Sequence, residues 1–113
     1  MPPELSIVIP AFEEESRVGG SITTILDYIR ASGISAELIV VDDGSKDQTK
    51  ATAEAAFSSA EGVPARVIRY DENRGKGFAV RTGLAAATAP MITKAIAANV
   101  NPLFIAKLRN YRL

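Results

Sequence analysis

The sequence predicts an α/β domain in which helices cover both faces of a parallel β-sheet. Three observations support this fold class. Apolar runs at residues 5–10 and 38–41 are typical of buried strands, and residues 66–70 are expected to form a short third strand. Each run is followed by a polar turn and then by helix-type spacing of apolar residues. Strands that alternate with helices in this way form parallel sheets through right-handed crossovers.

The first predicted strand covers residues 5–10, because Pro10 lacks the N–H group that a sheet ladder needs. Ala11 and Phe12 lead from it into three consecutive acids at residues 13–15. A dinucleotide-binding fold would carry a glycine-rich phosphate loop at this position. Three carboxylates would repel a phosphate, which argues against an unrelated Rossmann-like enzyme. The ordinary explanation of the acids is their favourable placement at a helix N-terminus.

A helix is expected from about Ser21, after the helix-disfavouring pair Gly19–Gly20, to a stop at Gly33. Its apolar residues recur at the spacing of a single helix face that packs on a sheet. They are Ile22, Ile25, Leu26 and Ile29.

The second strand, residues 38–41, ends at Asp42 and Asp43, and Gly44 permits a tight turn. Ser45 and Gln48 have the spacing of a capping box, which predicts a helix over residues 47–60 that stops before Gly62. In open α/β sheets, ligands bind beyond the carboxyl ends of the strands. Two carboxylates there could accept hydrogen bonds from a ribose or a base, or help to hold a cation. The alternative is that they serve only turn and cap geometry.

The third strand, residues 66–70, precedes a glycine-rich basic turn at residues 73–77 and another predicted helix. The apolar face of that helix is expected to contain Val80, Gly83, Leu84 and Ala87. Backbone amides at the start of a helix, with Arg74 and Lys76 beside them, favour an anion such as phosphate. The alternative is a solvated basic loop whose glycines serve turn geometry.

Composition excludes several classes of function. The 113-residue chain has 13 basic and 13 acidic residues, so no overall positive field indicates nucleic-acid binding. It has no cysteine and no histidine, which excludes disulfides, thiolate nucleophiles and soft metal sites. No apolar run approaches the roughly 20 residues that span a bilayer, and no signal-peptide pattern opens the chain. The expected location is therefore cytoplasmic, or the cytosolic face of a membrane.

Three stretches, residues 6–15, 40–49 and 73–81, together resemble the family 2 glycosyltransferases with the GT-A fold. The nearest subgroup is the polyprenyl-phosphate sugar transferases of the dolichyl-phosphate glucosyltransferase type, which favour a Glu-Glu-Glu run and an Asn-Arg-Gly-Lys-Gly turn. The resemblance covers about residues 5–90. It implies a Rossmann-like parallel sheet with helices on both faces, here a truncated GT-A fold.

The resemblance also implies a ligand, a UDP- or GDP-linked sugar bound over the strand ends, and a polyprenyl or dolichyl phosphate acceptor. Residues 1–90 would be the nucleotide-sugar-binding half of the domain. Asp42 would read the base with Asp43 beside it, and the basic turn would lie near the base or the diphosphate. The implied nucleotide-binding residues are Pro10, Ala11, Glu13, Asp42, Asp43, Arg74, Gly75 and Lys76.

The chain departs from the family after Pro90. The family continues into a strand that ends in Asp-x-Asp, whose carboxylates hold the Mg²⁺ or Mn²⁺ that neutralises the leaving diphosphate. Here no acid follows Glu72. The resemblance therefore assigns no catalytic residue and no metal ligand, and residues 91–113 are expected to be a divergent tail.

The end of that tail is compatible with a helix that begins at Asn101 and Pro102. Its basic residues make peripheral contact with a membrane an alternative to loose packing on the sheet. The interpretation of the whole chain is the nucleotide-binding half of a glycosyltransferase, inactive alone. The alternative is a non-catalytic nucleotide-binding or interaction module.

Overall fold

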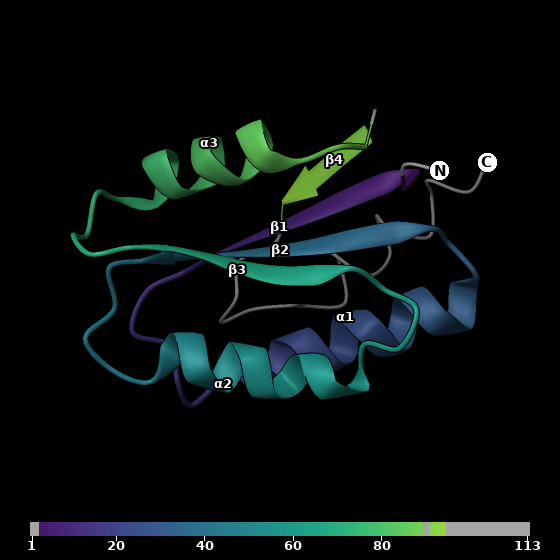
Figure 1. The fold of residues 1–113 in the computed structure, drawn as a ribbon, viewed down its shortest axis with the longest axis horizontal. Helices are drawn as coiled ribbons and strands as arrows, with labels where there is room; N and C mark the ends of the chain where they lie inside the picture. Colours follow the sequence, from purple (N-terminus) through teal and green to yellow (C-terminus); the bar gives the residue numbers. More distant parts are fainter. Residues whose placement is uncertain (1–2, 90, 95–113) are drawn as a thin grey trace.

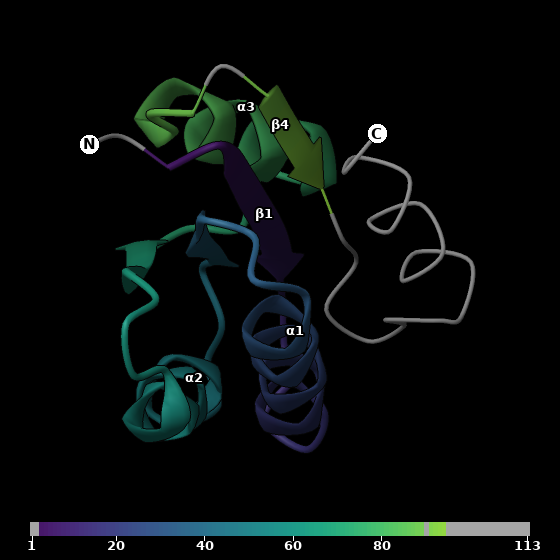
Figure 2. The same ribbon diagram turned by 90° about the vertical axis from the view of Figure 1, so that its right-hand side faces the viewer.

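A computed structural model describes residues 3–89 and 91–94, which form a four-stranded parallel sheet with helices on both faces (Figure 1). The strands are β1 (Leu5–Ala11), β2 (Ala36–Asp43), β3 (Ala65–Tyr70) and β4 (Met91–Lys94). The helices are α1 (Val18–Ser32), α2 (Thr49–Ala56) and α3 (Lys76–Ala86), and a short 3-10 helix, η1 (Phe57–Ser59), extends α2. Helices α1 and α2 cover one face and α3 covers the other (Figure 2). The predicted α/β fold class is confirmed.

The strand order reverses direction at β1, which makes a topological switch point between β1 and β4 that we call the winding switch. The order is β3-β2-β1-β4, so the chain moves outward from β1 to β3 and then returns through α3 to β4 on the other side of β1. In parallel α/β sheets, loops diverge at such a point and leave a crevice beyond the carboxyl ends of the strands. Here that crevice lies beyond the ends of β1 and β4.

The central strands β1 and β2 are buried along their whole length, as their apolar runs predict. β1 continues through Pro10 to Ala11, which pairs with Asp42, so the expected end at Pro10 is wrong. Among the described residues, β4 pairs with β1 only as far as Val8.

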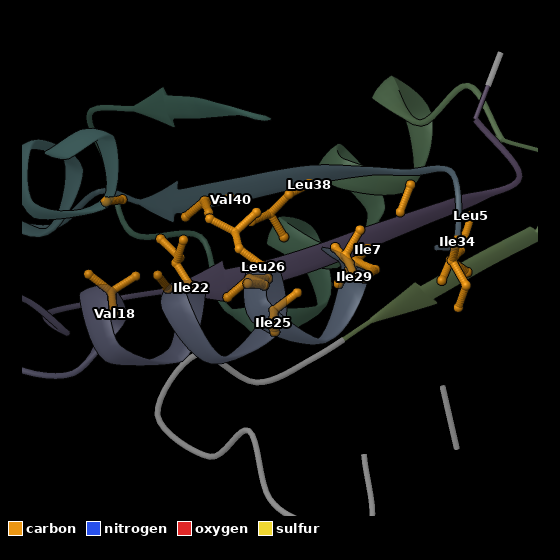
Figure 3. Packing of buried hydrophobic residues seen from close by; sticks show 14 residues of the cluster. Leu5, Ile7, Val18, Ile22, Ile25, Leu26, Ile29, Ile34, Leu38 and Val40 are labelled. Atoms are coloured by element: carbon orange, nitrogen blue, oxygen red, sulfur yellow. The ribbon is translucent and has the colours of Figure 1, made fainter. Parts of the chain in front are cut away.

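The main core lies between α1 and the sheet, where the predicted stripe of α1 packs on β1 and β2 (Figure 3). Gly33 ends the helix with a φ of 72°, as expected. The helix begins at Val18 rather than at about Ser21. Val18 is fully buried, and its burial offsets the poor helix propensity of the two glycines that follow it.

On the other face, α3 approaches the sheet through small residues. Ala79 and Gly83 are its buried positions. A Cβ on Gly83 would lie only 2.3 Å from a methyl group of Val8, so a glycine is required for this contact. Leu84, expected on the buried face, is 39% exposed. A large side chain cannot occupy the sheet-facing side of a helix that packs this closely.

β4 begins in the segment that the sequence analysis assigned to the tail, and pairs with β1 over Leu5–Val8. The domain boundary at residue 90 stays a prediction. The helix expected after Asn101 lies outside the described residues. None of the helices in the described part of the chain is both long and apolar enough to cross a lipid bilayer.

Candidate functional site

A pocket of about 250 Å³ lies at the carboxyl ends of the strands, where β1 ends and α3 begins. It adjoins the winding switch at the end of β1, on the side of β2 and α3, and ligands of this architecture usually bind at the carboxyl ends of the strands. Five of the eight predicted binding residues line it: Pro10, Ala11, Asp43, Gly75 and Lys76. Phe12, Glu14, Asn73 and Ala79 complete the lining.

Asp42 and Asp43 lie on opposite faces of the sheet. Successive side chains of a strand point to opposite faces, and the residues before them pack in different cores, Val40 with α1 and Val41 with α3. The neighbouring strand β3 supplies a polar partner on each face, since Arg69 is paired with Asp42 and Tyr70 with Asp43. The two aspartates therefore have different surroundings, and only Asp43 reaches the pocket.

Asp43 joins β2 to the turn that begins α3. It is 3% exposed, and its carboxylate accepts four hydrogen bonds. Oδ1 accepts from the Tyr70 hydroxyl at 2.5 Å and from the Arg74 amide at 2.9 Å. Oδ2 accepts from the Asn73 side-chain amide at 2.8 Å and from the Gly75 amide at 3.0 Å. These bonds use about all the lone-pair sites of one carboxylate, so a ligand donor would have to share an oxygen.

The basic turn is consequently organised by an internal anion. Arg74 and Gly75 direct their amides at Asp43, and the Arg74 guanidinium lies over the Phe78 ring, 5.3 Å from its centroid. This position holds the Arg74 side chain away from the pocket. Lys76, the first residue of α3, is the basic side chain that lines the pocket.

Tyr70, the last residue of β3, is one of the four hydrogen-bond donors to Asp43. Burial raises the pKa of the Tyr70 hydroxyl, and its hydrogen bond to the Asp43 carboxylate raises it further. The ring meets Phe78 edge to face, with centroids 5.2 Å apart. Tyr70 therefore remains a neutral donor that orients the carboxylate.

Asp42 serves the loop that follows β2. It is 1% exposed, accepts a hydrogen bond from the Ser45 amide at 3.0 Å and pairs with Arg69 at 3.4 Å. Arg69 also donates to the Ser45 carbonyl at 3.1 Å. Asp42 does not line the pocket. Its predicted role, hydrogen bonding to a base, would therefore require a ligand that extends beyond the pocket lining.

Glu13 connects the loops that follow β1 and β2. Its backbone adopts a positive φ of 53°, and its carboxylate accepts from the amides of Lys46 at 2.7 Å and Asp47 at 3.2 Å. The Glu13 amide donates to the Ser45 hydroxyl at 2.9 Å. Glu13 does not line the pocket; it holds the loop after β1, which does, against the loop after β2.

The capping box predicted at Ser45 and Gln48 is wrong, because the Ser45 hydroxyl bonds to Glu13 rather than to the helix. Asp47 instead accepts from the Thr49 amide at 2.9 Å and from the Thr49 hydroxyl. Burial alone would raise the pKa of Asp47, but these hydrogen bonds outweigh it and lower the pKa. Accordingly α2 begins at Thr49, two residues later than predicted.

The predicted binding residues did not include four that line the pocket: Phe12, Glu14, Asn73 and Ala79. Phe12 is 44% exposed although it is large and apolar. Its signal in the sequence was an aromatic residue directly after a buried strand, at the start of a polar turn. A residue at this position lies outside the core, and the face of its ring is available to stack on a ligand.

The described residues of the pocket region do not fit a divalent metal ion. Within residues 3–89 and 91–94, no three His, Cys, Asp or Glu side chains form a group that could hold a metal. The carboxylate of Asp43 already accepts four hydrogen bonds, and that of Asp42 pairs with Arg69. A divalent ion needs several oxygen ligands free to coordinate it.

Comparison with known proteins identifies the relatives of this chain. A model of the family "Glycosyl transferase family 2" matches residues 6–94. A human dolichyl-phosphate beta-glucosyltransferase is 40% identical over 86 residues, covering 72% of this chain and 26% of the relative. A glucosyl-3-phosphoglycerate synthase of Mycolicibacterium smegmatis is 34% identical over 106 residues, covering 92% of this chain and 34% of the relative. The chain thus spans about a quarter to a third of these relatives.

Two solved structures have the same arrangement of strands and helices. Glucosyl-3-phosphoglycerate synthase from Mycobacterium tuberculosis, in complex with Mn²⁺, UDP and glucosyl-3-phosphoglycerate, matches with a TM-score of 0.68 and 30% identity, covering 98% of this chain and 40% of that one. The mannosyltransferase PcManGT from Pyrobaculum calidifontis, in complex with GDP-Man and Mn²⁺, matches with a TM-score of 0.72 and 24% identity, covering 90% of this chain and 29% of that one. With its sheet order and the match over residues 6–94, the chain belongs to glycosyl transferase family 2.

Proposed function

We propose that this chain is the nucleotide-binding part of a glycosyltransferase that transfers a sugar from a nucleotide-sugar donor to a polyprenyl phosphate. The observation that carries the proposal is the pocket at the winding switch, lined by the ends of β1 and β2 and by the start of α3. The similarity to dolichyl-phosphate beta-glucosyltransferases supports the acceptor class. UDP-glucose is the donor to test first, since the 40% and 34% identical relatives described above are both named for glucosyl transfer.

The size of the pocket suits a nucleoside. A volume of about 250 Å³ is just below the roughly 300–1,000 Å³ of sites for drug-sized ligands. The base would stack on Phe12, an interaction worth about 1–3 kcal/mol per base in other proteins. A donor of the base or the ribose would share one Asp43 oxygen with the hydrogen bonds that this oxygen already accepts. The sugar and part of the diphosphate would extend beyond the pocket.

Lys76 and the N-terminus of α3 would face the diphosphate. The first N–H groups of a helix have no partner within it, and the helix dipole favours negative charge at that end. The amides of Arg74 and Gly75 are already bonded to Asp43. Contact with phosphate would therefore come from the Lys76 side chain and from amides further into the first turn.

Binding measurements test the proposed pocket. Phe12 and Leu84 are the two large apolar side chains exposed in the described residues, and only Phe12 lines the pocket. We expect Phe12→Ala to weaken UDP binding about tenfold, the loss of one stacking contact. The matched control Leu84→Ala should leave the Kd unchanged. Titration calorimetry with UDP, UDP-glucose and GDP measures both, and equal affinities of the wild type and Phe12→Ala would refute the site.

A second proposal concerns activity: the 113-residue chain alone transfers no sugar. Departure of a nucleoside diphosphate requires stabilisation of its growing charge, which a divalent ion supplies in other enzymes at several kcal/mol. No acid follows Glu72, and Asp42 and Asp43 are already paired or hydrogen-bonded. The loss of that stabilisation corresponds to on the order of a thousandfold in rate or more.

The assay combines radiolabelled UDP-glucose or GDP-mannose with dolichyl phosphate and Mn²⁺ or Mg²⁺. The expected result is nucleotide binding without transfer, which agrees both with the nucleotide-binding part of a glycosyltransferase and with the alternative, a non-catalytic nucleotide-binding module. Transfer that a chelator abolishes would contradict the expected inactivity, and would assign the metal to carboxylates that are bonded internally here.

A further inference from the structure

A second polar cluster lies at the opposite end of the sheet from the pocket. Glu37 of β2 is 8% exposed, and its neighbour on β1, Ser6, is fully buried. A carboxylate is rarely buried at such a position unless polar groups pair with it. Here one oxygen, Oε2, accepts from the Ser6 hydroxyl at 2.5 Å, the Thr88 amide at 2.7 Å and the Thr88 hydroxyl at 2.8 Å.

The cluster continues into the backbone after Thr88. The Ala89 amide donates to the Ser6 hydroxyl oxygen at 3.1 Å, so Ser6 accepts from Ala89 while it donates to Glu37. Two consecutive amides of the segment that enters β4 are thereby held by side chains of β1 and β2. Both residues are more than 50 positions away from Glu37 or Ser6 in the sequence.

Arg66 of β3 holds the same segment from its other end. Its Nη2 donates to the carbonyl of Ala86, the last residue of α3, at 2.8 Å. That helix ends without a left-handed glycine, since Ala87 is extended, with a ψ of 142°. A basic side chain can satisfy a terminal carbonyl in place of such a cap. Burial raises the pKa of Glu37, but the hydrogen bonds from Ser6 and Thr88, and to a lesser degree the positive charge of Arg66, lower it.

The segment held in this way carries the chain from α3 to the winding switch. Within the described residues, β4 comprises Met91–Lys94 and pairs with β1 at four positions. Because all four strands are parallel, the chain leaves β4 at the edge of the sheet where Ala11 and Asp43 line the pocket. The position of β4 therefore sets one boundary of that edge.

We propose that Glu37 is a positioning residue: with Ser6 and Thr88 it holds the α3–β4 connection on the sheet and keeps β4 beside β1 at the winding switch. This inference does not depend on the nucleotide proposal, since it concerns the strand and not the ligand.

Amide hydrogen exchange of the 113-residue chain tests the proposal, because it resolves local opening from global unfolding. In Glu37→Ala, exchange of the β4 amides should accelerate at least about tenfold relative to that of the β2 amides, since even one of the three hydrogen bonds lost, each to a charged group, contributes that much. Thr88→Val removes one donor but keeps the amide, and should produce a smaller change of the same kind. Glu37→Gln keeps an acceptor oxygen and should restore part of the protection.

The matched control is Ile25→Val, a small truncation in the core on the other face of the sheet. It should accelerate exchange in β2 and β4 only through global stability, without changing their ratio. If Glu37→Ala or Thr88→Val behaves like this control, the cluster is merely structural and the proposal is wrong. Should Glu37→Ala fail to fold, the ratio measured in Thr88→Val decides the question. A Thr88→Val ratio equal to the wild-type value also refutes the proposal.

Discussion

Replacement of Asp43 by asparagine is the sharpest test of how the pocket is built. Asparagine has almost the same shape, but one carboxylate oxygen becomes an NH₂ group. Each oxygen of Asp43 accepts two hydrogen bonds. Whichever oxygen is replaced, an NH₂ group faces two donors. Because Asp43 is only 3% exposed, these groups cannot form hydrogen bonds to water instead.

The magnitude follows from the bonds that are lost. A hydrogen bond to a charged group contributes about 1.5–3 kcal/mol, and a buried group left unsatisfied costs a further 1–3 kcal/mol. Because the remaining donors can shift toward the oxygen that is kept, we expect a loss of about 3 kcal/mol in the free energy of unfolding. For a chain of this size, that corresponds to a fall in Tm of about 12 °C.

Urea unfolding followed by circular dichroism measures this difference directly. The control is Asp71→Asn, since Asp71 has a side chain that is 94% exposed and pairs with Arg69 at the surface. Exposed pairs contribute about 0–1 kcal/mol, so the control should change stability little. If Asp43→Asn loses no more than Asp71→Asn, the four-bond network around Asp43 is not present in solution.

Three further predictions concern the loops and the titrating groups. Gly44→Ala should cost about 2–4 kcal/mol, because φ is +74° and the new Cβ would lie 2.5 Å from the Asn73 amide nitrogen; Gly62→Ala, with a φ of +78° and open space, should cost only about 1 kcal/mol in the same unfolding assay. Burial raises the pKa of Glu37, but hydrogen bonds from Ser6 and Thr88 outweigh it and lower the pKa below 4.5, so its stabilisation is complete above that pH and is lost as the pH falls; unfolding curves of the wild type and Glu37→Gln should converge in acid. Burial and the bond to Asp43 raise the pKa of Tyr70 above 10.0, so stability should fall as the pH rises past 10.0, and phenolate absorbance should show a late-titrating group that is absent in Tyr70→Phe.

The fold was predictable because local patterns and tertiary structure agree. The stripe from Ile22 to Ile29 and the two central apolar runs need no knowledge of the rest of the chain to be identified. The end of β1 was not predictable in this way. Pro10 stops a strand only where a neighbour needs its N–H, and the residues around Pro10 do not show which strand will pair with it.

The site was predictable in outline and not in detail. Pro10, Ala11, Asp43, Gly75 and Lys76 do line one pocket, because parallel topology brings the ends of the strands together. The roles within the pair of aspartates depend on which face of the sheet each occupies. That depends on the register of β2, which places Val41 and Asp43 on the α3 side.

Some side chains form hydrogen bonds to residues distant in the sequence rather than to the local groups that their spacing indicates. Ser45 has the position of a helix cap but accepts from Glu13, 32 residues away. Glu37 adjoins an apolar run as an isolated acid, and its partner Thr88 lies 51 residues away. Such bonds arise only when the sheet has assembled, so short-range patterns cannot reveal them.

The most direct test of the central claim is a titration of ¹⁵N-labelled protein with UDP, followed amide by amide. The pocket at the winding switch predicts saturable shifts concentrated at Ala11, Phe12, Gly75 and Lys76, with little change at Gly62 on the opposite edge of the sheet. Shifts that are diffuse, or that are largest around Gly62, would contradict the assignment of this pocket as the nucleotide site.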